Sequence, residues 1–85
     1  MATMGSHTAL YRIDPSQNMS RYYTLCVQPN LFGGFSLIRN WGRIVTGGQM
    51  RLELFDNEDN AQEAHDRLIS SKLKRGYVVG AVKER

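Results

Sequence analysis

The spacing of apolar residues along the chain predicts a series of β-strands followed by one helix. The clearest alternation lies at residues 49–55, where Met50, Leu52 and Leu54 are apolar and the residues between them are polar or charged. Other segments are rich in aromatic and β-branched residues and are bounded by Pro, Asn or Gly; they predict further strands at 9–13, 21–28, 35–43 and 77–79. The pattern therefore predicts a mostly antiparallel sheet of about four to five strands.

The period of the apolar residues changes after Phe55. Five residues fall on one stripe at helical spacing: Ala61, Ala64, His65, Leu68 and Ile69. Acidic residues at the start, basic residues at the end and Gly76 just beyond predict a helix from about Asn57 to Leu73. We expect its stripe to pack on Met50, Leu52 and Leu54, with His65 filling space at the edge of the core.

Together these elements predict an α+β fold, in which one helix covers one face of the sheet. A chain of 85 residues with 41% hydrophobic content is long enough for one small domain. Residues 1–8 are small and polar, so we expect a flexible leader there and a single domain at residues 9–85. Residues 44–46 are expected to extend the third strand to a turn at Gly47-Gly48.

The sequence contains no membrane-spanning stretch and only one cysteine. No apolar stretch approaches the roughly 18 to 20 residues that a membrane-spanning helix needs, so we expect a soluble, cytoplasmic protein, free or associated with the nucleoid, without a membrane partner. The single cysteine, Cys26, cannot form an internal disulfide or a cysteine-based zinc site. Its place in an apolar strand predicts a small buried hydrophobe.

Charge is distributed unevenly along the chain. The net charge is +3 and the computed pI is near 9.4, which favours a polyanionic partner. Six of the eight acidic residues lie between Glu53 and Asp66. The basic residues gather instead at two places, Arg39 with Arg43 and the group Lys72, Lys74 and Arg75.

The only Trp of the chain lies between two arginines, in the segment Arg39-Asn40-Trp41-Gly42-Arg43. If the strand keeps its two-residue period, Arg39, Trp41 and Arg43 share one side and form an aromatic surface flanked by two guanidinium groups. Gly42 leaves room for a ligand to approach. The simpler interpretation is a core Trp with arginine stems packed across it.

The chain resembles the WGR domain family, named for the tripeptide seen here as Trp41-Gly42-Arg43. The resemblance covers most of the chain, in the order that small bacterial single-domain members show. It includes these segments: Arg12-Ile13-Asp14-Pro15, Asn18-Met19, Arg21-Tyr22-Tyr23, Gly48-Gln49 and Lys74-Arg75-Gly76-Tyr77. It implies a compact, mostly antiparallel sheet with one helix across it.

The resemblance also implies a function. In poly(ADP-ribose) polymerases this domain binds DNA near strand breaks, with the Trp and Arg of the motif near the broken end; here those roles fall on Trp41 and Arg43. We therefore expect a non-catalytic module that binds nucleic acid, specifically DNA with a preference for ends or nicks. The expected contact residues are Arg39, Asn40, Trp41, Gly42, Arg43, Lys72, Lys74, Arg75 and Tyr77.

Other function classes fit less well. An adaptor that binds a separate protein through the same aromatic and arginine surface stays open, because Trp, Tyr and Arg are also enriched in protein interfaces. An enzyme is not expected, since His7 and His65 lie in unlike contexts with no nucleophile motif beside them. No spacing of ligands predicts a metal site, and no phosphate-binding fingerprint predicts a cofactor.

Overall fold

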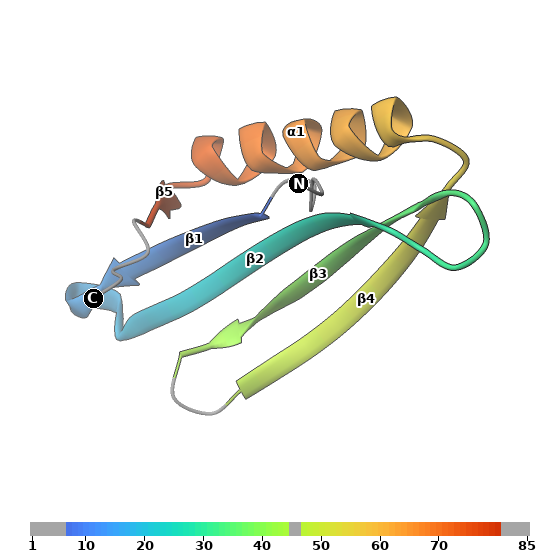
Figure 1. Cartoon of the computed structure of the whole chain (residues 1–85). Helices are drawn as coiled ribbons and strands as arrows, with labels where there is room; N and C mark the ends of the chain where they lie inside the picture. Colours follow the sequence, from blue (N-terminus) through green and yellow to red (C-terminus); the bar gives the residue numbers. More distant parts are fainter. Residues whose placement is uncertain (1–6, 45–46, 81–85) are drawn as a thin grey trace, which may run out of the picture.

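The computed structural model describes residues 7–44 and 47–80, which form a five-stranded sheet and one helix (Figure 1). In chain order the elements are β1 (His7–Asp14), a 3-10 turn (Pro15–Gln17), β2 (Met19–Pro29), β3 (Phe35–Arg43), β4 (Gly47–Phe55), α1 (Glu58–Lys74) and β5 (Val78–Val79). The strand order is β4-β3-β2-β1-β5, and every neighbouring pair is antiparallel. The predicted α+β class, strand number and single helix are confirmed.

Two predicted boundaries need comment. The first strand begins at His7 rather than Ala9, so His7 and Thr8, which we expected in the leader, belong to the sheet. They pair with Cys26 and Leu25 of β2, which continues the hairpin register. Residues 1–6 lie outside the described residues. The third strand ends at Arg43, and residues 45 and 46 of its expected extension also lie outside the described residues. The turn expected at Gly47-Gly48 is wrong, because both residues pair with β3 and belong to β4.

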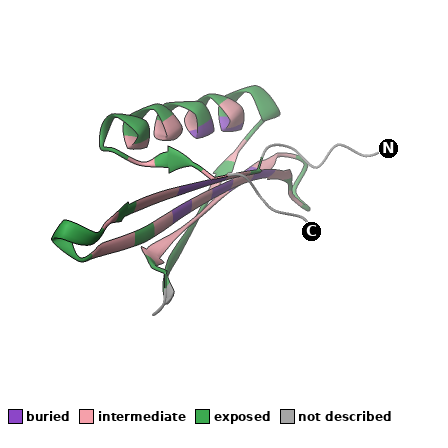
Figure 2. Cartoon of the chain, turned by 90° about the vertical axis from the view of Figure 1, so that its left-hand side faces the viewer, coloured by how far each residue is buried: buried purple, intermediate pink, exposed green. Residues whose placement is uncertain are grey.

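The core lies between the sheet and α1 (Figure 2). It is built from the largest fully buried side chains, with Tyr23 and Ala61 beside them: Leu10, Leu25, Val27 and Leu37. Ala64, Leu68 and Ile69 of the helix pack against this cluster, so the predicted helical stripe is confirmed. Burying apolar surface of this kind is the main stabilising contribution in a small domain.

The predicted partners of that stripe on β4 are wrong. Met50, Leu52 and Leu54 are 66, 50 and 60% exposed and lie on the face of the sheet away from the helix. The reason is the register, which places Glu53 opposite the buried Leu37, so that Glu53 and not its apolar neighbours shares the helix-facing side. Strand alternation shows which residues share a face but not which face the helix covers.

Cys26 lies on the same uncovered face. It is partly exposed rather than fully buried, and its Sγ lies 3.8 Å from Oε1 of Gln28. The alternation of β2 explains this, because Tyr23, Leu25 and Val27 take the helix-facing positions.

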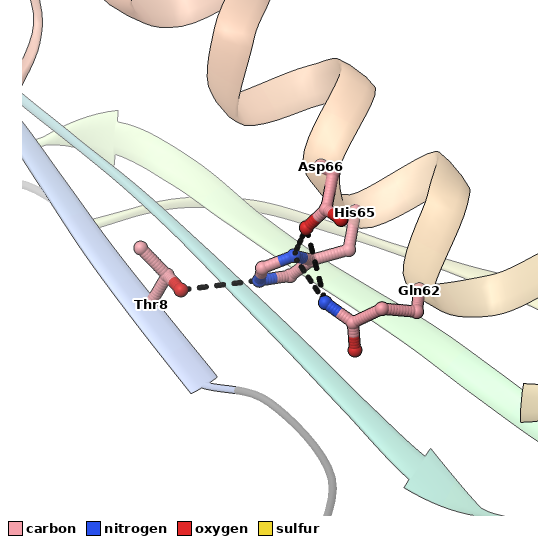
Figure 3. A network of polar contacts seen from close by, with 4 residues as sticks. All are labelled: Thr8, Gln62, His65 and Asp66. Atoms are coloured by element: carbon pink, nitrogen blue, oxygen red, sulfur yellow. Dashed lines mark hydrogen bonds and ion pairs between the residues drawn. The ribbon is translucent and has the colours of Figure 1, made fainter. Parts of the chain in front are cut away.

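The helix is fixed at both ends and in its middle. Its N-cap, Asn57, accepts a hydrogen bond of 2.9 Å from the backbone N–H of Asn60, and Gly76 follows the last turn with a φ of 97°. His65 is buried, with Nε2 3.1 Å from Oγ1 of Thr8 and Nδ1 3.0 Å from Oδ1 of Asp66 (Figure 3). His65 therefore fills the expected place at the edge of the core and joins α1 to β1.

Candidate functional site

A cavity of about 290 Å³ lies where β2, β3 and the end of α1 meet. We call it the Trp41 pocket and define it by its lining residues: Arg21, Tyr23, Trp41, Gly42, Arg43, Lys72 and Tyr77. Strand pairing brings together four of these seven residues, because Arg21 lies opposite Arg43 and Tyr23 opposite Trp41. The helix contributes Lys72 from its last turn, and Tyr77 follows as the chain returns towards β5.

Two aromatic rings form the floor of the pocket. The rings of Tyr23 and Trp41 are stacked, with centroids 5.8 Å apart and planes inclined by 19°. Tyr23 is buried, whereas Trp41 is only partly buried and packs against the core while lining the cavity. Trp41 therefore combines the two roles considered from the sequence, since it supports the core and presents aromatic surface to solvent.

Lys72 lies over this aromatic surface. Its Nζ is 4.4 Å from the ring centroid of Tyr23 and 5.5 Å from that of Tyr77, within the range of cation–π attraction. Partial burial lowers the pKa of Lys72, and the nearby positive charges of three arginines lower it further: Arg75, Arg39 and Arg21. A bound anion would offset the repulsion between these positive charges.

Arg21 and Arg43 extend the positive charge along the adjacent strands. Both side chains are exposed, and Arg43 Nη2 donates a 3.4 Å hydrogen bond to the backbone oxygen of Asn18. Within residues 7–44 and 47–80, neither arginine nor Lys72 forms an ion pair with a carboxylate. The pocket therefore brings together three cationic groups whose charge these residues leave unneutralised.

Arg39 lies beneath this surface rather than on it. Its guanidinium bonds to Oε2 of Glu53 at 3.0 Å and to the hydroxyl of Tyr23 at 3.2 Å, and its side chain is only 14% exposed. Its Cζ also lies 5.9 Å from the ring centroid of Trp41. These contacts give Arg39 the geometry of a group that positions both aromatic rings, with its charge already opposed by Glu53.

The structure separates the remaining predicted contact residues. Trp41, Gly42, Arg43, Lys72 and Tyr77 come together in the pocket. Three others do not line it: Asn40, Lys74 and Arg75. Asn40 follows the alternation of β3 onto the uncovered face of the sheet, opposite Met50. Lys74 and Arg75 are exposed at the helix end beside the pocket.

The sequence did not identify Arg21 and Tyr23 as pocket residues. Both lie in a strand whose residues looked like ordinary sheet formers, and their role depends on the β2–β3 register. That register is the signal that finds them, since it places each directly beside a residue of the Trp-Gly-Arg motif.

Gly48 allows β4 to lie close to the motif strand. A Cβ added at Gly48 would overlap the backbone oxygen of Trp41, so a larger residue would force the two strands apart. This position thus fixes the backbone that carries the Trp41 ring.

A second cavity, of about 390 Å³, lies at the other end of β3. Its lining includes Asn30, Phe32 and Asp56 but no lysine or arginine. The Trp41 pocket is therefore the better candidate for binding an anion.

Among residues 7–44 and 47–80 there is no group of three His, Cys, Asp or Glu side chains that could hold a metal ion. In the same part of the chain, no helix is long and apolar enough to cross a membrane.

Comparison with known proteins places this chain in a family. The family model described as the WGR domain matches residues 6–84. The chain belongs to the WGR domain family. WGR domains are binding modules rather than catalytic domains, and the family is associated with nucleic-acid binding in proteins like the poly(ADP-ribose) polymerases.

Two relatives and one solved structure are similar to this chain, which spans less than a third of the length of the relatives and about a fifth of the solved chain. Protein y4dW of Sinorhizobium fredii is 50% identical over 66 residues, which cover 78% of this chain and 32% of that protein. Protein YfeS of Escherichia coli is 35% identical over 46 residues, covering 54% of this chain and 19% of that protein. A crystal structure from Bacteroides fragilis has the same fold, with a TM-score of 0.74 at 24% identity, over 89% of this chain and 20% of that one.

Proposed function

We propose that the Trp41 pocket binds DNA and prefers a duplex end or a nick to continuous duplex. One observation carries the proposal: a stacked aromatic pair lies beside three cationic side chains that have no carboxylate partner in the described residues. Family membership supports the broader part, because WGR domains are associated with nucleic-acid binding. The preference for interrupted duplex follows from the chemistry of the pocket.

The cationic groups supply the phosphate contacts. Arg21, Arg43 and Lys72 line one cavity and flank Trp41 along two neighbouring strands and the helix end. Arginine can grip a phosphate with two parallel hydrogen bonds, whereas lysine acts as a compact charge. Lys74 and Arg75, exposed at the helix end, extend the same positive surface to phosphates further along the backbone.

The aromatic group supplies the preference for an end. Along an intact B-form duplex the faces of the bases are stacked on one another, so an indole has no flat partner there. At a terminus or a nick a base or sugar face is open, and stacking on an aromatic side chain is worth about 1 to 3 kcal/mol per base. Trp41 is partly exposed in the pocket, and Arg39 and Tyr23 hold its ring in place.

Competition between two forms of the same DNA tests this proposal. A labelled, short duplex with 5′-phosphorylated ends is bound to the protein and then displaced by unlabelled linear or closed circular duplex at equal base pairs. We expect the linear fragments to displace the protein at lower concentration. Trp41→Ala should weaken end binding by about five-fold to more than a hundred-fold, the range that stacking energies imply.

A matched variant and a binding measurement at low salt make the result specific. Tyr22→Ala removes an aromatic residue from the uncovered face of the adjacent strand, so it should leave end binding unchanged. Equal displacement by circular and linear DNA would remove the preference for ends. Phosphate contacts are strongest at low salt, so absence of DNA binding there would instead favour a separate protein as the partner.

A further inference from the structure

Strand β4 forms a free edge of the sheet. Within the described residues its neighbour is β3 on one side, and no strand lies on the other. The strand is nine residues long and carries three exposed apolar side chains, Met50, Leu52 and Leu54. A long edge with apolar side chains is a template for pairing with another strand.

The hydrogen-bonding pattern of the sheet shows which backbone groups this edge presents. Residues of an antiparallel strand alternate between those that bond to one neighbour and those that bond to the other. At the β2–β3 pair, the N–H of Ile44 donates to the oxygen of Ser20 at 3.0 Å. At the other end of the same pair, the N–H of Asn30 donates to the oxygen of Gly34 at 2.9 Å. Even-numbered residues of β3 thus bond to β2, and odd-numbered ones bond to β4.

The β3–β4 register carries this alternation to the free edge. Odd-numbered residues pair with odd-numbered ones, for example Leu37 with Glu53 and Arg39 with Arg51. The odd-numbered residues of β4 therefore use their backbone groups on β3. The N–H and C=O groups of Met50, Leu52 and Leu54 point away from β3 and are available to a further strand.

We propose that β4 pairs antiparallel with β4 of a second copy of this chain, with the two Leu52 residues opposite each other. This register joins even-numbered residues to even-numbered ones, as the backbone requires. It places Met50 opposite Leu54 of the second copy, so the exposed apolar side chains form cross-strand pairs. The two sheets become one continuous sheet with a two-fold axis at Leu52.

Charge selects this register over its neighbours. With Leu52 at the centre, Arg51 lies opposite Glu53 of the second copy, and symmetry forms the pair twice. These are non-hydrogen-bonded positions, where Cα atoms are only about 4.5 Å apart and side chains are closest. Shifting the pairing by two residues in either direction would oppose the two Arg51 side chains or the two Glu53 side chains. The side chain of Arg51 is 64% exposed, and its Nε lies 3.5 Å from Oε2 of Glu53 in the same strand.

Charge reversal provides the test, using sedimentation equilibrium of the whole chain. We expect wild-type protein to reach about twice the 9.7 kDa monomer mass as concentration rises. Arg51→Glu and Glu53→Arg should each stay monomeric, because each creates two like-charge pairs. An equimolar mixture of the two variants should recover the dimer, since one copy then carries two acids and the other two bases at the paired positions.

Two further variants keep the result interpretable. Glu53 also pairs with Arg39, so circular dichroism should first establish that Glu53→Arg is folded. Leu52→Pro removes an edge-facing N–H without touching a bond to β3, and we expect a folded monomer. Arg67→Glu, the same charge reversal on the exposed face of α1, should leave dimerisation unchanged. A wild-type mass of one chain at every concentration, or a mixture that stays monomeric, would overturn the proposal.

Discussion

Replacing Lys72 with Met isolates the contribution of one charge in the Trp41 pocket. Met keeps most of the apolar stem that lies against Tyr23 and Tyr77, but it cannot contact a phosphate. The pocket contains three cationic side chains, Arg21, Arg43 and Lys72. If each neutralises one phosphate, the pocket contributes about −2.7 to the slope of the logarithm of the binding constant against the logarithm of salt concentration, and Lys74 and Arg75 add to that slope in the wild type and the variant alike.

These slopes predict a measurable difference. Lys72→Met should make the slope about 0.9 less steep, so that between 50 and 200 mM salt its affinity should fall about 3.5-fold less than that of the wild type. Fluorescence anisotropy of a labelled short duplex at several salt concentrations gives both slopes. Affinity of the variant should also be lower at every salt concentration in this range.

A control with the same change in net charge separates the pocket from the general field of the protein. Arg67→Met removes one positive charge from the exposed face of the same helix, where Arg67 pairs with Glu63 at 3.1 Å. Its salt slope should equal that of the wild type. The reasoning is refuted if Lys72→Met keeps the wild-type slope, or if Arg67→Met lowers the slope by as much.

Three further predictions concern stability and titration. Leu25→Ala, at a fully buried position, should lower the free energy of unfolding by about 3 to 5 kcal/mol in urea denaturation, and Leu54→Ala, at 60% exposure, by less than about 1 kcal/mol; similar losses would contradict the assigned faces. Leu68→Ala should cost about 2 kcal/mol, since Leu68 packs against the core but is only partly buried, and a loss below about 0.5 kcal/mol would place it outside the core. Hydrogen bonds from His65, which has the larger effect, and from Gln62 lower the pKa of Asp66 below its ordinary 3.8. Ionised Asp66 therefore stabilises the fold above pH 3.8, and this contribution is lost as the pH falls through the lower pKa of the folded state. His65→Phe should move that pKa back towards 3.8 in an NMR titration, and an unchanged value would show that the bond to His65 is not its cause.

The sequence predicts much of this fold because local patterns determine much of it. The helical stripe from Ala61 to Ile69 and the cap at Asn57 depend on residues close in the chain, and both are observed. The face that α1 covers depends on packing between distant elements. Met50, Leu52 and Leu54 alternate as a buried strand would, yet they lie on the uncovered side.

The sequence predicts the adjacent motif residues and the basic helix end of the pocket, but not the residues that strand pairing adds. Trp41, Gly42 and Arg43 are adjacent in the sequence, and Lys72 was identified from the charge at the helix end. Arg21 and Tyr23 required the strand register, and the burial of Arg39 required the position of Glu53 on the neighbouring strand. Charge and aromatic content therefore indicated the chemistry, whereas the pairing of strands decided which groups meet.

The intrinsic fluorescence of the protein tests most directly whether the Trp41 pocket binds DNA. Trp41 is the only tryptophan in the chain, so its emission reports on this pocket alone. Titration with a short 5′-phosphorylated duplex should quench that emission and protect it from a collisional quencher such as acrylamide, with the same midpoint as the anisotropy of the labelled duplex. A rise in anisotropy with Trp41 emission and acrylamide quenching both unchanged would show that DNA binds elsewhere and would contradict the account.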